Sequence, residues 1–302
     1  MPLQTDALLD RRRLKRRLTL WQTLAVVFLV LAIVLTVGRV VGVQSDHVAR
    51  VTVTGIIAEN PKRMYALRRV GRDSNAKALI VRINSPGGSV VGGEELFRVL
   101  RTVAKNKPVV AVMGSLATSA GYMAALGADH IIARQGSLTG SIGVILQSTD
   151  LTGLLEKLGI KAEAIKSAPL KAVPNPLEKL TPEGRQAARN VVMDSYNMFV
   201  DIVAKRRKLA RPAALRLADG RVFTGRQALA AKLVDELGGE DEARRWLETA
   251  HKIGRDLPIK NRDPKTESSL RSALRSLIPG KTVFSERLTL DGLVSLWHPG
   301  PR

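Results

Sequence analysis

The chain has 302 residues, of which 45% are hydrophobic and 25% charged, a balance typical of a globular protein and not of a disordered or multi-spanning one. The absence of cysteine excludes disulfides, thiolate zinc sites and cysteine nucleophiles, so a covalent nucleophile has to be Ser, Thr or Lys. The net charge of +21 would attract anionic partners, but aromatic residues make up only 4% of the chain and do not interleave with basic runs, which disfavours nucleic-acid binding.

The N-terminal segment has the pattern of a membrane anchor. Residues 1–17 are basic, and the uncharged run from Leu18 to Gly38 has 21 residues. At about 1.5 Å per residue, such a helix covers a hydrocarbon core of roughly 30 Å. The sequence therefore predicts a transmembrane anchor over residues 18–43, with the N-terminus cytoplasmic because the positive charges precede it, and with the bulk of the chain exported. A cleaved signal peptide is the alternative, disfavoured by the long run and the lack of an A-x-A-like site.

Beyond the anchor, candidate strands and helices alternate. The expected strands are 48–57, 78–83, 108–113, 130–133, 142–146 and 161–165. The expected helices are 62–70, 94–104, 119–126, 151–158, 181–209, 225–233 and 240–250. This alternation favours a largely parallel sheet covered by helices, in one α/β domain over residues 44–255. Residues 256–302 form a basic, proline-containing tail that could dock or stay mobile.

Several common functional motifs are missing. The four histidines are scattered and no HExxH motif occurs, so a metal site has little support. Gly280-Lys281-Thr282 resembles the end of a phosphate loop, but the preceding glycine and strand are absent, which favours a solvated tail. A Ser-His-Asp triad using Asp129 and His130 is conceivable, although these residues open a strand and more often form its solvated edge.

One serine lies where a strand is expected to pass into a helix. Ser119 stands among small residues in the segment GSLATSAGY (114–122). At such a junction a hydroxyl and backbone N–H groups can be exposed together. A serine in this position is nevertheless more often only the N-cap of the helix.

Four segments in order carry a family resemblance: RINSPGG (82–88), GSLATSAGY (114–122), LTGSIGV (138–144) and KSAPLK (166–171). With them, the region from Val51 to Gly239 resembles the signal peptide peptidase A family, which are serine proteases with a Ser-Lys dyad. The resemblance implies the α/β fold of Clp protease and the crotonases, a spiral of β-β-α units, preceded here by one N-terminal transmembrane helix.

The resemblance assigns roles residue by residue. Ser119 matches the nucleophile, Lys171 the general base, and Ser141 the hydroxyl that helps hold the lysine. Gly88 matches the glycine whose N–H forms the oxyanion hole with the N–H of Ser119. An ammonium group cannot accept the serine proton, so Lys171 has to lie in an apolar, partly desolvated site. No cofactor or metal is implied.

The family resemblance also implies a setting and leaves alternatives open. Family members are membrane-anchored homo-oligomers that degrade signal peptides left in the membrane, so peptides, the membrane and further copies are the expected partners. The expected location is a bacterial inner or cell membrane, with the catalytic domain periplasmic or extracytoplasmic.

Ala168, Leu170 and Ala172 depart from the family pattern, which puts the shape of the pocket in doubt. A noncatalytic envelope scaffold or regulator and a crotonase-like acyl-thioester enzyme remain as alternatives.

Overall fold

The computed structural model describes residues 16–32, 45–264 and 294–296. The chain divides into two compact units, Met1–Ser45 and Asp46–Arg302. In the first unit, residues 16–32 are helical and their side chains are exposed. Among the described residues, no helix is long and apolar enough to cross a membrane. The remainder of the expected anchor, residues 33–43, lies outside the described part of the chain.

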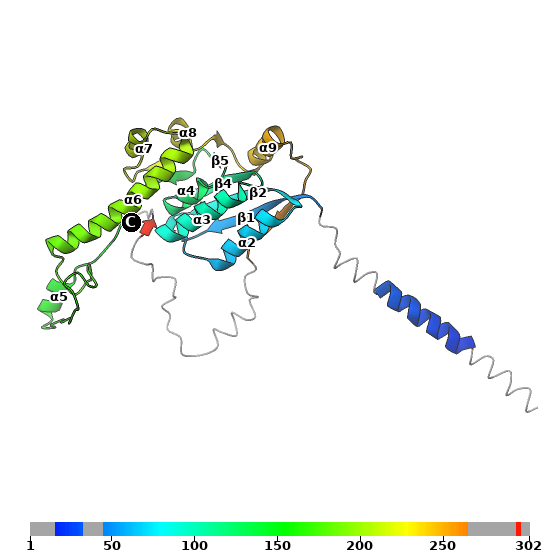
Figure 1. The fold of residues 1–302 in the computed structure, drawn as a ribbon, viewed down its shortest axis with the longest axis horizontal. Coiled ribbons are helices and arrows are strands. Elements are labelled where there is room, and N and C mark those ends of the chain that lie inside the picture. Colours follow the sequence, from blue (N-terminus) through cyan, green and yellow to red (C-terminus); the bar gives the residue numbers. More distant parts are fainter. Residues whose placement is uncertain (1–15, 33–44, 265–293, 297–302) are drawn as a thin grey trace, which may run out of the picture. The chain divides into compact units, whose positions relative to one another are not determined.

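The second unit alternates between strands and helices in the order that the sequence suggests (Figure 1). Its strands are β1 (His47–Thr54), β2 (Ala76–Ser85), β3 (Gly87–Ser89), β4 (Val109–Thr118), β5 (His130–Ala133), β6 (Leu138–Gly140), β7 (Val222–Thr224), β8 (Glu236–Leu237), β9 (Ile259–Asn261) and β10 (Val294–Leu296). Its helices are α2 (Pro61–Arg72), α3 (Val90–Val103), α4 (Ala120–Ala125), α5 (Thr152–Lys157), α6 (Pro182–Arg207), α7 (Arg211–Leu217), α8 (Gly225–Ala230) and α9 (Glu240–His251).

Among the described residues, the main sheet has eight strands and is parallel except for the pair β6–β7. Its principal order is β7-β6-β4-β2-β1-β9, and β5 and β8 branch from β4. The first half of β4 pairs with β5, whereas the second half pairs with β6, so that Thr118 lies opposite Gly140. The predicted mixed α/β class is therefore confirmed, and β4 leads from the centre of the sheet to Ser119.

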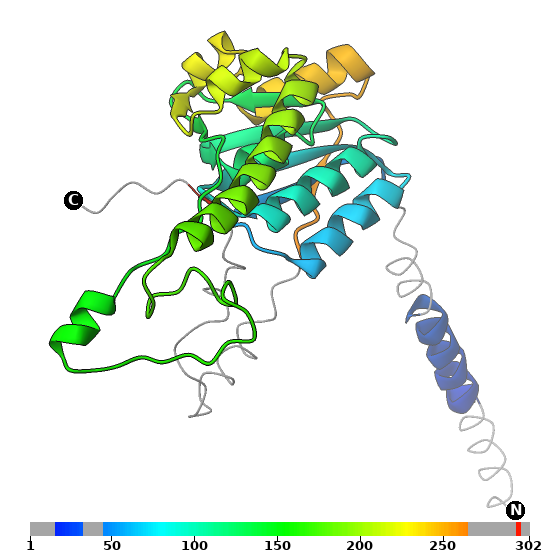
Figure 2. The same ribbon diagram turned by 60° about the vertical axis from the view of Figure 1, so that its left-hand side comes forward.

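Side chains of the central strands alternate between two buried faces, as expected for a sheet covered on both sides. One face packs against α2, α3, α4 and α6, and the other packs against α9, as Figures 1 and 2 show. The first face takes Ala49, Val51, Val53, Leu79, Val81, Ile83, Ala111 and Met113, whereas the second takes Val48, Ala78, Ile80, Val110 and Val112.

Two predicted strands are wrong. The strand expected at 142–146 lies earlier, at Leu138–Gly140, because those residues pair with the end of β4. Ser141 then adopts a φ of 48°, which turns the chain away from the sheet. Residues 161–165 lie outside any helix or strand and are exposed, so their alternating pattern has no neighbouring strand to pair with.

The expected start of the tail belongs to the sheet. Within residues 256–302, β9 (Ile259–Asn261) pairs in parallel with β1, and the backbone N–H of Thr52 donates to the carboxylate of Asp263 at 2.6 Å. Residues 259–263, which the sequence analysis places in the tail, therefore make contacts with β1. Farther along, β10 (Val294–Leu296) pairs with β3.

Candidate active site

Ser119 joins β4 to α4 in a strained backbone conformation. Its φ and ψ are 57° and −120°, a region that residues with a Cβ rarely occupy and that costs about 1–3 kcal/mol. The residue occupies the N-cap position of α4, yet its side chain makes no capping hydrogen bond, and it is only 1% exposed. An ordinary N-cap serine has an extended backbone and caps with its hydroxyl. Ser119 instead has the sharp strand-to-helix geometry typical of a nucleophile.

Buried contacts at both ends hold α4 in place behind Ser119. The hydroxyl of the fully buried Tyr122 donates to the backbone oxygen of Leu233 at 2.9 Å, and burial raises the pKa of Tyr122 well above its usual value. At the other end, the guanidinium of Arg206 donates to the backbone oxygens of Leu126 and Ala128 at 2.8 and 2.7 Å. Because helix α4 is fixed, the strained turn before it is held in position.

Hydrogen bonds hold the turn before β3 beside Ser119. The hydroxyl of Ser85 donates to Gly55 O at 2.6 Å and accepts from Gly87 N–H at 3.1 Å. The hydroxyl of Thr118, the residue before Ser119, donates to Pro86 O at 3.0 Å. These bonds attach the Pro-Gly-Gly turn to the end of β4, so the structure brings two of the predicted motifs together.

Gly88 can only be glycine in this arrangement, and its peptide groups have a defined direction. A Cβ at position 88 would lie 1.8 Å from Ile57 O. Ile57 N–H donates to Gly87 O, and Ser89 N–H donates to Ile57 O, both at 2.8 Å. Since successive residues of a strand point alternately to opposite edges, the N–H and C=O of Gly88 point away from Ile57. This direction is compatible with the expected role of the Gly88 N–H as an oxyanion donor.

The second expected oxyanion donor is occupied. Ser119 N–H donates to Gly140 O at 2.8 Å, so it is not available for a substrate in this structure. The next N–H belongs to Ala120, the first residue of α4, where helix geometry leaves the amide without a partner inside the helix. The strand-to-helix motif itself uses the N–H of the residue after the nucleophile, a signal that the sequence analysis overlooked.

Ser141 follows the residue whose carbonyl accepts the hydrogen bond from Ser119 N–H. It follows Gly140, the acceptor of the Ser119 N–H, and its own N–H donates to Arg221 O at 2.8 Å. Ser141 is 8% exposed and has a positive φ. The structure thus brings Ser119, Ser141 and Gly88 to one end of the sheet.

Lys171 lies elsewhere in this unit. It is exposed, in the irregular segment between α5 and α6, and its backbone N–H donates to Ala168 O at 3.0 Å. Figures 1 and 2 show this green segment at the outer end of α6, beyond the layer of helices that covers the sheet. Within the described part of the chain, no hydrogen bond or ion pair joins the Lys171 ammonium to Ser119.

The residues of the alternative triad have structural partners. The Asp129 carboxylate accepts from Arg101 at 2.8 Å and from the N–H of Val109 at 3.1 Å. The ring of His130 stacks on Trp246 with centroids 4.7 Å apart. These contacts give Asp129 and His130 structural roles, so a catalytic role is not needed to explain their positions. In the described ranges, no group of three acidic or histidine side chains could hold a metal ion.

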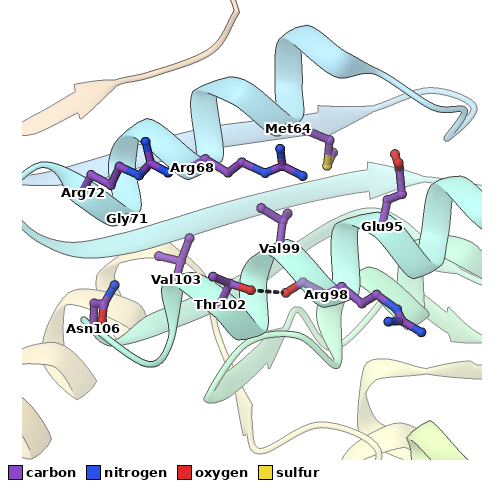
Figure 3. Close-up of a pocket in the computed structure, with 10 residues that line it drawn as sticks. All are labelled: Met64, Arg68, Gly71, Arg72, Glu95, Arg98, Val99, Thr102, Val103 and Asn106. Carbon is purple, nitrogen blue, oxygen red and sulfur yellow. Dashed lines mark hydrogen bonds between the residues drawn. The ribbon is translucent and has the colours of Figure 1, made fainter.

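Two surface hollows in the described part of the chain lie away from Ser119. One of about 560 Å³ lies between α2 and α3 (Figure 3) and is lined by Met64, Arg68, Gly71, Arg72, Glu95, Arg98, Val99, Thr102, Val103 and Asn106. A second, of about 490 Å³, is lined by residues 146–149 and 172–176. The lining of the second hollow includes Ala172, the residue after Lys171, but not Lys171 itself.

Comparison with known proteins identifies the family. The pattern of "Peptidase family S49" matches residues 101–254, about half of the chain. "Putative protease slr0021" of Synechocystis sp. is 43% identical over 204 residues, covering 67% of this chain and 73% of that protein. "Putative signal peptide peptidase SppA" of Enterococcus faecium is 31% identical over 226 residues, covering 70% of this chain and 66% of that protein.

A third relative, "Protease 4" of Haemophilus influenzae, is 34% identical over 178 residues, covering 59% of this chain and 29% of that longer protein. The names of these relatives agree with the resemblance that the four sequence segments carry. The chain therefore belongs to peptidase family S49.

Proposed function

We propose that the protein is a serine endopeptidase with Ser119 as nucleophile and Lys171 as general base. The conformation of Ser119 carries the proposal, because a positive φ at a serine where a strand passes directly into a helix is the sharp turn typical of a serine nucleophile, and strained backbone of this kind clusters at active sites. Membership of a peptidase family supports a catalytic role for this strained hydroxyl.

In the proposed reaction, the neutral amine of Lys171 accepts the Ser119 proton as the hydroxyl oxygen attacks the scissile carbonyl. The N–H groups of Gly88 and Ala120 stabilise the oxyanion, and one such donor is worth about 10²- to 10³-fold in kcat. Lys171 then passes the proton to the leaving amine, and water hydrolyses the acyl-enzyme by the same route. Ser141 is proposed to orient the amine.

The dyad is proposed to be completed between copies of the chain. Ser119 is buried, whereas Lys171 is exposed on an arm formed by residues 145–181. This arm exposes large apolar side chains, namely Ile145, Leu151, Leu154, Leu158, Ile160, Ile165, Leu170 and Leu177. Exposed apolar surface of this kind marks an interface. Docking against a neighbour would bury these side chains and remove water from Lys171, as a lysine base requires.

The proposed substrates are signal peptides left in a membrane, together with other apolar peptides. The uncharged run 18–38 supports a single-pass anchor in a bacterial membrane, with the catalytic unit on the outer side. An anchored enzyme meets lipid-embedded peptides at a high effective concentration. The basic excess of the chain would also favour an anionic membrane surface.

The test is cleavage of a signal-peptide-like substrate by the full chain in detergent. Ser119→Ala and Lys171→Ala are expected to abolish cleavage, whereas two matched controls, Ser115→Ala at an exposed site in β4 and Lys161→Ala on the same arm, retain it. Activity of the wild type should rise with pH, because only the neutral amine accepts a proton.

Mixing the Ser119→Ala and Lys171→Ala variants tests whether one active site combines residues from two copies of the chain. If Ser119 of one copy works with Lys171 of another, random co-assembly restores function at about a quarter of the sites. A mixture that stays inactive would contradict the shared site. Cleavage that survives either single substitution would contradict the dyad, and a folded but wholly inactive wild type would favour the scaffold alternative.

A further inference from the structure

The hollow between α2 and α3 combines a positively charged margin with an apolar floor. On the α2 side, Arg68 and Arg72 lie one helical turn apart, and Figure 3 shows both side chains beside the hollow. Both are exposed, and neither guanidinium has a hydrogen bond or an ion pair with another described residue. The floor is formed by buried apolar side chains, namely Met64, Val99 and Val103.

The charge of the hollow is concentrated on its α2 side. On the α3 side, Arg98 donates to the carboxylate of Glu94 at 2.7 Å, and Glu95 adds a negative charge to the lining. Helix α2, in contrast, carries five basic residues and no acidic one. An anion that enters the hollow therefore meets two unpaired guanidinium groups on one side and an apolar surface beneath.

This combination fits the headgroup end of an anionic phospholipid. A guanidinium group matches a phosphate with paired N–H donors, and the apolar floor suits the hydrocarbon part of an amphiphile. The volume of about 560 Å³ lies in the range of about 300–1,000 Å³ typical of small-molecule sites. On the same helix, Tyr65 is 65% exposed, with the guanidinium of Arg69 6.0 Å from its ring centre. Exposed tyrosine beside basic residues is typical of a membrane–water interface.

The chain enters the catalytic unit close to this hollow. Strand β1 begins at His47, whose backbone N–H donates to Asn75 O at 2.9 Å, and Asn75 follows the end of α2 at Arg72. In the sequence, only three residues separate His47 from the anchor expected over residues 18–43. Because an extended residue spans at most about 3.6 Å, a membrane that holds this anchor stays close to the entry point.

We propose, resting on the proposed membrane anchor, that the hollow between α2 and α3 binds the phosphate of an anionic phospholipid and seats the catalytic unit on the bilayer surface. The guanidinium groups of Arg68 and Arg72 donate to the phosphate oxygens, while the glycerol end of the lipid lies on the apolar floor. One arginine near an anionic membrane contributes about fivefold to binding, so the two contribute roughly 30-fold together.

The test measures how close the hollow comes to a bilayer of known composition. Because the chain has no cysteine, Ser74→Cys, at an exposed position just after α2, carries a single fluorophore. The full chain is inserted into nanodiscs that contain a quenching lipid with a nitroxide headgroup, in phosphatidylcholine alone or with phosphatidylglycerol added. Thr249→Cys is the control position, on α9 and thus on the other face of the sheet.

We expect phosphatidylglycerol to increase quenching at position 74 and not at position 249. Arg68→Gln combined with Arg72→Gln should lower the docking equilibrium constant roughly 30-fold, because glutamine keeps the helix propensity of arginine but lacks its charge. The matched control, Arg185→Gln combined with Arg189→Gln, removes two exposed arginines at the same spacing on α6 and should leave the constant unchanged.

Equal quenching in the two kinds of nanodisc, or an equal docking constant without Arg68 and Arg72, would overturn the proposal. Inorganic phosphate, added at constant ionic strength, separates a lipid from a free anion. If it abolishes the quenching, the hollow is a phosphate site and the membrane assignment is wrong. Insertion of the full chain into the nanodiscs tests the anchor by itself, and cleavage tests Ser119, so a failure of the proposed function is seen separately. A chain that does not insert contradicts the anchor and this proposal with it.

Discussion

Replacing Gly88 with alanine perturbs the candidate oxyanion hole by a distance that the structure defines. The added Cβ would lie 1.8 Å from Ile57 O, whereas Cβ atoms in proteins essentially never approach such an atom within 3.0 Å. Strand β3 therefore has to move by about 1.2 Å, the difference between these distances. A misplacement of about 1 Å at a reacting centre can cost about 100-fold in rate.

We therefore expect Gly88→Ala to lower kcat/KM by at least about 100-fold, equivalent to about 2.7 kcal/mol of transition-state stabilisation. The assay is hydrolysis of a signal-peptide-like substrate by the full chain, alongside thermal unfolding to show that the protein folds. Gly136→Ala is the matched control, because a Cβ there meets no atom within 4 Å. An unchanged kcat/KM in Gly88→Ala would refute the reasoning.

Three further substitutions test stability and assembly. Tyr122→Phe removes the donor to Leu233 O and should lower the free energy of unfolding by about 1–2 kcal/mol in chemical denaturation. Because folding raises the pKa of Tyr122, the wild type should also lose stability as pH rises above about 10, where the unfolded tyrosine ionises, and an equal loss in Tyr122→Phe would contradict this. Thr181→Ala removes the cap on Gly184 N–H and should cost about 1 kcal/mol by the same assay; no loss would show that the cap is unimportant. Leu158→Ser, on the arm, should reduce oligomer mass in light scattering without lowering the unfolding midpoint, and an unchanged mass would count against the arm as an interface.

Local sequence patterns predicted much of the fold. The β-branched runs became central strands because they are buried on both faces, and Thr181 with Pro182 marked the start of α6, where the Thr181 hydroxyl accepts from Gly184 N–H. Strand pairing was less predictable, since it depends on partners distant in the sequence. Residues 161–165 alternate like a strand but have no partner, whereas the three-residue strand Ile259–Asn261 forms because β1 offers a free edge.

The positions of Ser119 and Gly88 could be expected from the sequence, because each lies within a short motif of the candidate site. Ser119 lies at the turn from β4 into α4 and Gly88 lies in β3, directly after Pro86 and Gly87, and the hydrogen bond from Thr118 to Pro86 O brings the two segments to the same end of the sheet. The engagement of Ser119 N–H by Gly140 O could not be read from spacing, because it arises when β6 pairs with β4. The exposure of Lys171 and the pairing of β10 with β3 are likewise long-range features that local propensity does not encode.

The central claim is that the Ser119 hydroxyl is activated by Lys171. Its most direct test is labelling of the full-length protein with a fluorophosphonate, followed by mass mapping of the modified peptide. The account predicts one adduct, on Ser119, which is absent in Ser119→Ala, strongly slowed in Lys171→Ala and unchanged in Lys161→Ala. Labelling at another serine, or labelling of Ser119 at an equal rate without Lys171, would contradict it.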